Sequence, residues 1–173
     1  MAIRDTLLPE FDEEMANTRK MLERVPDGRF DFTPHAKSWT VDRLAGHVAD
    51  LPNWVGHTMS VEVLELMPGQ YKPFEPKNRK ELLEQFDRHV REAHAAIAKA
   101  TDEQLNTMWT MKWEGKTVMT MPRINVLRSV VLNHLIHHRA QLGVYLRLMD
   151  VAVPGMYGPS ADEAPFGMEE KAA

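Results

Sequence analysis

The chain has 173 residues, of which 43% are hydrophobic and 27% are charged, and its formal net charge is −4. This length and balance are typical of one globular domain, so we expect residues 1–173 to form a single domain with its own core. Basic and acidic residues are interspersed, so no basic surface indicates a nucleic-acid partner. Cysteine is absent, which excludes disulfides, thiolate metal ligands and a cysteine nucleophile.

The N-terminus is charged from Arg4 onward and has no apolar stretch of the kind found in signal peptides. No uncharged apolar run reaches the roughly 20 residues that a membrane-spanning helix needs. The pattern therefore predicts a cytoplasmic protein without a membrane partner. The lack of cysteine is compatible with that reducing compartment.

Two helices are expected in the first part of the chain. Apolar residues at spacings of three and four predict the first helix over 4–24. The second starts near Thr40, bends or divides at Pro52 and resumes as far as Leu66. Its apolar stripe consists of Val41, Leu44, Val48, Leu51 and Val55.

Two further helices are expected in the second part. One spans 78–100, with Asn78 as its cap and Glu81 as the partner in a capping box. The other starts at Pro122, a favoured first helical position, and runs to about Met149.

Between these two helices, β-branched and aromatic residues over 107–120 flank Glu114-Gly115. This arrangement favours a short β-hairpin, and an irregular loop fits the same residues. After the last helix, prolines and glycines over 151–166 predict a packed tail or loop, and about 168–173 are expected to fray. Four long helices with short-to-moderate connections therefore predict an all-α fold, an up-down-type four-helix bundle decorated by the hairpin.

The candidate functional residues are histidines. His134 and His138 are four residues apart, so on a helix they point the same way and can bind one metal ion. They lie on an otherwise apolar face, where two unpartnered imidazoles would be costly to bury. His47 lies at the inward edge of the second helix, and bundles build metal sites between facing helices. Spacing therefore predicts the metal ligands His47, His134 and His138.

Other residues near these histidines have alternative interpretations. His137 can pair with His134 in place of His138, or lie in a substrate pocket, or lie at the surface. Asp50, three residues after His47, can orient a histidine, act as a base, be a fourth ligand or simply face solvent. Gln141 can bind a ligand or a neighbouring helix, and Trp54 can line a pocket above the metal.

Three neutral imidazoles leave a divalent ion with an open position, which is typical of catalytic rather than structural sites. Zinc and nickel fit this donor set first, and iron, copper and manganese stay open because availability decides among them. Arg139, beside His138, is expected to form an ion pair, whereas His35, His89 and His94 lack partners at ligand spacing.

Several segments together resemble one known family. They are Ser38-Trp39-Thr40, Leu44 to His47, His134 to Leu142, and Val153 to Ser160. The chain resembles the DinB/YfiT-like superfamily of metal-binding four-helix-bundle proteins over nearly its whole length. Its last helix matches the family pattern H-x3-H-R-G-Q except that Ala140 replaces the glycine.

The resemblance implies a metal ion held by His47, His134 and His138, a homodimer and a small-molecule substrate. Characterised relatives include S-transferases and isomerases that use low-molecular-weight thiols such as bacillithiol or mycothiol, and metal-dependent hydrolases. Three functions follow as hypotheses: a metal-dependent enzyme with an external thiol cosubstrate, a hydrolase in which metal-bound water attacks, and a non-catalytic binding module. For the hydrolase, Asp50 or Glu114 would be the base.

Overall fold

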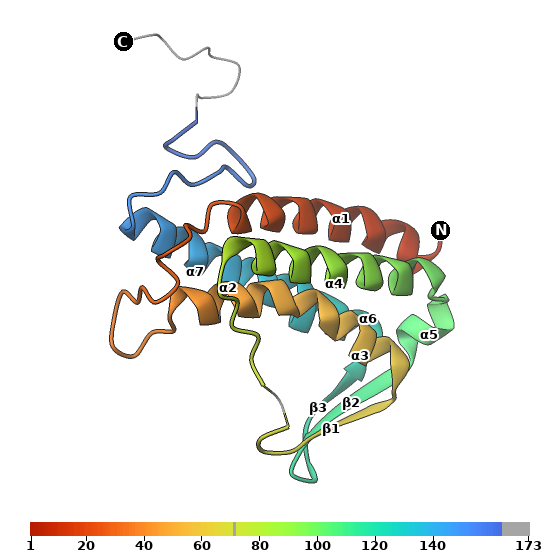
Figure 1. The fold of residues 1–173 in the computed structure, drawn as a ribbon. Helices are drawn as coiled ribbons and strands as arrows, with labels where there is room; N and C mark the ends of the chain where they lie inside the picture. The colour runs from red at the N-terminus through yellow and green to blue at the C-terminus, as the bar shows by residue number, and fades with distance from the viewer. Residues whose placement is uncertain (71, 164–173) are drawn as a thin grey trace.

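A computed structural model describes residues 1–70 and 72–163 of the chain, and Figure 1 shows long helices side by side with a small sheet at one end. The helical elements are α1 (Ile3–Leu22), α2 (Val41–Asp50), the 3-10 turn η1 (Leu51–Asn53), α3 (Trp54–Ser60), α4 (Arg79–Lys99), α5 (Asp102–Asn106), α6 (Arg123–Val126), the π-helical η2 (Leu127–Asn133) and α7 (His134–Leu148). The strands are β1 (Val63–Leu66), β2 (Met108–Trp113) and β3 (Lys116–Pro122).

The predicted four-helix bundle is confirmed. Its four members are α1, α2 with its continuation through α3, α4, and the run from α6 to α7. The helical periodicity of the sequence corresponds to burial, because every residue of the stripe predicted for the second helix is buried in the core. The same core contains apolar residues of the other three helices, among them Leu7, Phe11, Leu22, Leu82, Phe86, Ile97, Leu127, Val131, Leu135 and Leu142.

Side-chain contacts fix the directions of the helices. Ile3 donates its backbone N–H to Asp102 at 2.8 Å, and Arg79 donates its own to Asp27 at 2.8 Å, so α1 and α4 are antiparallel. The helix α4 runs parallel to α2 (Figure 1), so the two consecutive helices do not alternate in direction as the predicted up-down arrangement would require. Each of α1 and α2 contacts both α4 and α7, which places α2 directly beside α7.

The predicted hairpin is confirmed as the antiparallel pair β2–β3. Its two-residue turn has positive φ at both Glu114 (48°) and Gly115 (76°), the backbone form that matches the twist of a hairpin. The helical prediction for 61–66 was wrong, because α3 ends at Ser60 and β1 pairs in parallel with β2. Val61 and Leu64 have helical spacing, whereas Leu64 and Leu66 have the spacing of one strand face, and hydrogen bonding to β2 decides for the strand. The short helix α5 was not predicted.

The last long helix differs locally from the sequence expectation. Pro122 is its N-cap rather than its first helical residue, and the helix widens into η2 just before His134. π-helical turns are rare and occur often at functional sites. Beyond α7, residues 151–163 form no helix, and Val151, Val153 and Met156 pack partly buried against the core. The prediction of fraying over 168–173 lies outside the described residues.

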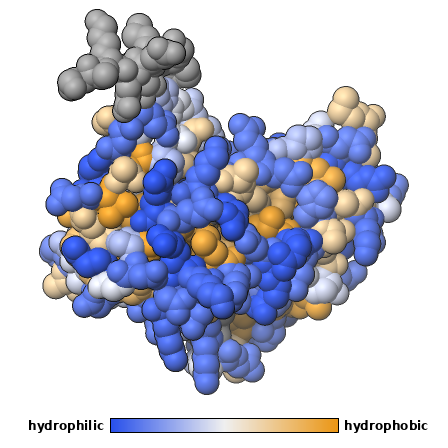
Figure 2. Space-filling model, turned by 45° about the horizontal axis from the view of Figure 1, so that its top comes forward, coloured by the Kyte–Doolittle hydropathy of each residue, from blue (hydrophilic) through white to orange (hydrophobic). Residues whose placement is uncertain are grey.

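Within the described segments, no helix combines the length and apolar character that crossing a bilayer would require. Figure 2 shows one face of the molecule, where hydrophilic residues dominate and hydrophobic residues form patches between them.

Candidate metal centre

The three predicted ligands meet where α2 and α7 face each other. His134 and His138 lie one turn apart at the start of α7, and His47 of α2 lies opposite them. Nε2 of His134 lies 2.9 Å from Nε2 of His138 and 3.4 Å from Nε2 of His47. One ligand atom from each ring lies within 4.8 Å of the others. In the described part of the chain, this is the one group of histidines or carboxylates with such geometry.

The outer nitrogens of two rings are held by oxygen acceptors. Nδ1 of His134 lies 3.3 Å from the carbonyl oxygen of Val130, in η2, and Nδ1 of His138 lies 2.7 Å from Oε1 of Gln141. These oxygens can only accept, so Nδ1 carries the proton in both neutral rings. The two Nε2 lone pairs therefore point toward each other with no hydrogen between them.

This arrangement fits a divalent cation. Facing lone pairs repel each other unless a positive charge lies between them. A tetrahedral ion with metal–nitrogen distances of about 2.0–2.1 Å places its ligand nitrogens roughly 3.3 Å apart. The observed separations of 2.9 and 3.4 Å lie on either side of that value. Three imidazoles fill three positions and leave at least one for an external ligand.

Burial keeps the three rings in the neutral form. The pKa of His47 is lowered to about 4, first by burial and then by the nearby His138 and His134, with a smaller effect from Arg43. Burial is also the largest cause that lowers the pKa of His134 and the pKa of His138. Because neutral imidazole is the form that binds metal, the rings can coordinate an ion at neutral pH without first losing protons.

Gln141 joins His138 to His137. Its Oε1 accepts from Nδ1 of His138, and its Nε2 lies 3.1 Å from Nε2 of His137, to which it donates. His137 thus lies on the flank of the triad, one step removed through the amide. The structure places Gln141 as the group that sets the tautomer and ring orientation of His138.

Trp39, in the loop before α2, forms a wall of the site. Its ring stacks on His138 with centroids 5.6 Å apart and meets His47 edge-on at 5.4 Å. Arg43 lies over the same indole, with Cζ 4.9 Å from the ring centre. Sequence reasoning missed Arg43, although its position four residues before His47 on one helix was a usable signal.

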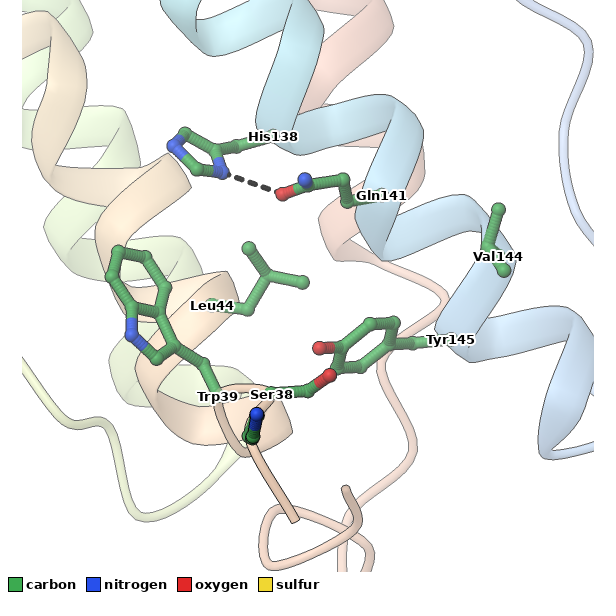
Figure 3. Close-up of a pocket in the computed structure, with 8 residues that line it drawn as sticks. Ser38, Trp39, Leu44, His138, Gln141, Val144 and Tyr145 are labelled. Atoms are coloured by element: carbon green, nitrogen blue, oxygen red, sulfur yellow. Dashed lines mark hydrogen bonds between the residues drawn. The ribbon is translucent and has the colours of Figure 1, made fainter. Parts of the chain in front are cut away.

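Three hollows border the triad. The His138 hollow, of about 410 Å³, lies between the start of α2 and the end of α7, and Figure 3 shows Gln141 hydrogen-bonded to His138 at one side of it. It is lined by Lys37, Ser38, Trp39, Leu44, His138, Gln141, Val144 and Tyr145. The methionine hollow, of about 380 Å³, is lined by His47, Trp54, Met111, Met119, Ser129, Val130 and His134. The Arg43 hollow, of about 190 Å³, is lined by Trp39, Arg43, His47, Pro73 and Phe74.

The two carboxylates considered as bases lie elsewhere. Asp50 lies 3.6 Å from Nδ1 of the buried His89 and lines a separate hollow of about 430 Å³ together with His57. Glu114 occupies the hairpin turn and is exposed. Trp54, which was expected to line a pocket above the metal, lines both that separate hollow and the methionine hollow. It therefore borders the triad, unlike Asp50 and Glu114.

Arg139, between His138 and Gln141, points away from the site into the bundle. The predicted ion pair is present, because Nη1 lies 2.8 Å from Oε2 of Glu14 in α1. The same guanidinium donates to Thr18 at 3.1 Å and to the hydroxyl of Tyr157 at 2.7 Å. It therefore holds α7, and the ligands that α7 carries, against α1.

Fold and site together define a helical-bundle protein whose three histidines can hold a metal ion. The model of the DinB family matches residues 2–171, and the chain belongs to the DinB family. The chain is 26% identical over 170 residues to the uncharacterized protein YrdA of Bacillus subtilis (strain 168), which covers 95% of each chain.

Solved structures share the fold. A DinB-like protein from Bacillus cereus ATCC 10987 is similar with a TM-score of 0.69 and 25% identity, over 90% of this chain and 98% of that one. YfiT from Bacillus subtilis, described as a probable metal-dependent hydrolase with an unusual four-helix bundle topology, is similar with a TM-score of 0.66 and 19% identity, over 86% and 89%. A mutant mycothiol-dependent maleylpyruvate isomerase is similar with a TM-score of 0.52 and 12% identity, over 87% and 62%.

Proposed function

We propose that this protein is a metal-dependent enzyme that uses an external low-molecular-weight thiol, as S-transferases do. The observation that carries the proposal is the convergence of three neutral Nε2 atoms, with two Nδ1 protons already engaged by oxygen acceptors. When bound there, a divalent ion lowers the pKa of a coordinated thiol and supplies a thiolate nucleophile. The chain has no cysteine, so the reactive thiol has to come from a cosubstrate.

The protein side chains would do three things in this reaction. His47, His134 and His138 hold the ion, and zinc or nickel suits their donor set first, with iron, copper and manganese as further options. Gln141 keeps His138 in the tautomer that presents Nε2. Trp39 covers one side of the triad, and the apolar residues of the methionine hollow border another, so a bound ligand would meet little polar surface there.

The second candidate is a metal-dependent hydrolase, which the description of YfiT supports. A hydrolase of this kind commonly pairs the ion with a carboxylate base. Among the described residues, no carboxylate lines the three hollows that border the triad, and Asp50 instead faces His89. This favours the thiol reaction, which needs no separate base once the thiol is ionised.

A homodimer and a small-molecule substrate remain predictions from the family resemblance. Sedimentation velocity tests whether the protein is a homodimer.

The proposal is tested first by metal content. Untagged protein should contain about one divalent ion per chain by elemental analysis, and His47→Ala or His134→Ala should lose it, because two remaining imidazoles bind far more weakly. His94→Ala is the matched control, since His94 is half-exposed and lies beside Asp12 on another face. Equal metal content in all four proteins would refute the site.

The reaction is tested with the metal-loaded protein and a panel of thiols, namely bacillithiol, mycothiol, glutathione and coenzyme A, each with several electrophiles. Conjugation that depends on both the metal and the thiol supports the proposal. Ester or amide turnover without added thiol would support the hydrolase instead. A fully metal-loaded protein that showed neither thiol conjugation nor hydrolysis would support the third hypothesis, a non-catalytic binding module.

A further inference from the structure

Arg43 is a cation held beside the triad. It lies one helical turn before His47 on the same face of α2, and it lines the Arg43 hollow together with His47. Its guanidinium lies over the ring of Trp39, the ring that also stacks on His138. The indole therefore holds the charge next to the metal ligands, while part of the side chain stays exposed to solvent.

The hydrogen-bonding capacity of this guanidinium is not used up. Its Nε is buried and has no hydrogen-bond partner. The Glu75 carboxylate is 3.9 Å from Nη1, beyond hydrogen-bond distance, and the Glu75 side chain is 56% exposed. A guanidinium offers five N–H donors in a planar fork that matches a carboxylate. An anionic group in the Arg43 hollow would find the outer nitrogens of this guanidinium already oriented, whereas Nε is buried.

The other side of the triad has the opposite character. In the methionine hollow, the residues other than the two ligands His47 and His134 are apolar except for Ser129. No carboxylate among the described residues lines either hollow, and an anion in the Arg43 hollow would compete only with the exposed Glu75 for the guanidinium. A ligand with one charged end would therefore place that end toward Arg43 and its apolar part over Met111 and Met119.

We propose that Arg43 is a specificity-determining residue that binds an anionic group of the ligand that meets the metal ion. The ligand class is then a carboxylate-bearing molecule that reaches both the ion position beside His47 and the guanidinium of Arg43 within one hollow. The role proposed for Arg43 rests on the proposed function in one respect: it assumes that an external ligand binds at the open position of the metal ion.

The test measures ligand affinity, not turnover. Full-length protein loaded with Co²⁺ is titrated with 3-mercaptopropionate and with its methyl ester, and the sulfur-to-cobalt absorption band reports binding. The acid should bind at least about tenfold more tightly than the ester, as expected for one hydrogen-bonded charge pair. Arg43→Met should lose this preference at unchanged cobalt content, and Arg43→Lys should keep part of it.

The matched control is Lys37→Met, which removes a positive charge from the His138 hollow on the far side of Trp39. It should keep the preference for the acid, and an equal loss in Lys37→Met would overturn the assignment to Arg43. Hydroxamates bind metal ions without any thiol, so succinic monohydroxamate and its methyl ester form a second pair. Absence of both thiol bands would refute the thiol proposal alone. Equal affinity of the two hydroxamates for the wild-type protein would refute the role of Arg43.

Discussion

Each ring of the candidate centre in α7 has one nitrogen turned outward and one turned toward the ion position. The outward nitrogen of His134 is satisfied by a backbone carbonyl, and that of His138 by a side-chain amide. Only the second partner can be removed by substitution. Gln141 therefore offers a direct test of how far ring orientation contributes to metal binding.

Gln141→Leu should weaken metal affinity by about 10- to 100-fold, because His138 loses the acceptor that fixes its tautomer and rotation. Competition against a chromophoric chelator measures this. Gln85→Leu is the control, since Gln85 also contacts a histidine through its side-chain amide, with its Nε2 3.1 Å from Nε2 of His89 in α4, away from the triad. Its metal affinity should equal that of the wild-type protein. A Gln141→Leu protein with unchanged affinity would show that packing alone orients His138.

At the residue scale, helical spacing paired His134 with His138, and the bundle expectation added His47, which the packing of α2 against α7 brings within 3.4 Å of His134. Spacing was not sufficient to assign Asp50, which shares a face with His47 in sequence but faces His89 in space. The reason is that helix α4 packs beside α2 and supplies the histidine that Asp50 contacts. Spacing within one helix carries no information about which neighbour a side chain meets.

At the scale of elements, α2 is held close to the segment before α4. A Cβ atom built on Gly46 would overlap the carbonyl oxygen of Phe74 and lie 2.9 Å from Cδ of Pro76. Glycine is therefore required here by close approach of backbone, one residue before His47. This contact also holds the connection that forms part of the Arg43 hollow.

Gly46→Ala should lower the free energy of unfolding by about 1–3 kcal/mol, because backbone atoms cannot move aside as a side chain can. Urea denaturation measures the change. Gly56→Ala is the control in the neighbouring helix α3, where the added methyl group meets nothing within 4 Å. It should raise stability by about 0.5–1 kcal/mol, since alanine loses less conformational entropy on folding. Similar effects at both positions would contradict the close approach.

The elements also show where local patterns fail. The apolar residues within 61–66 have spacings found in helices and in strands. The segment forms strand β1 because it pairs with β2, more than forty residues away in the sequence. The π-helical widening of η2 has no counterpart in the sequence pattern. The hairpin was predictable because its turn depends on two adjacent residues, Glu114 and Gly115, and glycine readily adopts the positive φ that the turn requires.

At the scale of the whole molecule, one buried charge cluster joins the first helix, the last helix and the segment after it. Arg139 is 2% exposed, and it contacts Glu14 of α1 and the hydroxyl of Tyr157. The Tyr157 hydroxyl accepts from Arg139 and donates to Glu14 at 2.8 Å, so all three side chains have hydrogen-bond partners within the cluster. Burial, together with this bond, raises the pKa of Tyr157.

Arg139→Met should lower the free energy of unfolding by about 3–5 kcal/mol, because it leaves Glu14 buried without its counter-charge. Chemical denaturation of the metal-free protein measures this without any contribution from bound ion. The double variant Glu14→Leu/Arg139→Met should recover much of the loss, since no unpaired charge remains. If the double variant were as unstable as the sum of the two single variants, the pair would not act as a coupled unit.

The sequence by itself determined the helices and their buried faces, the hairpin and the three histidines, because periodicity and turn chemistry depend on residues close together in the chain. Tertiary structure alone decided the direction of α4, the parallel strand β1, the partner of Asp50 and the place of Arg43 at the triad. These depend on contacts between segments far apart in sequence, which no local pattern encodes. The sequence thus indicated which atoms can hold an ion, and the packing of α2 against α7 decided what surrounds them.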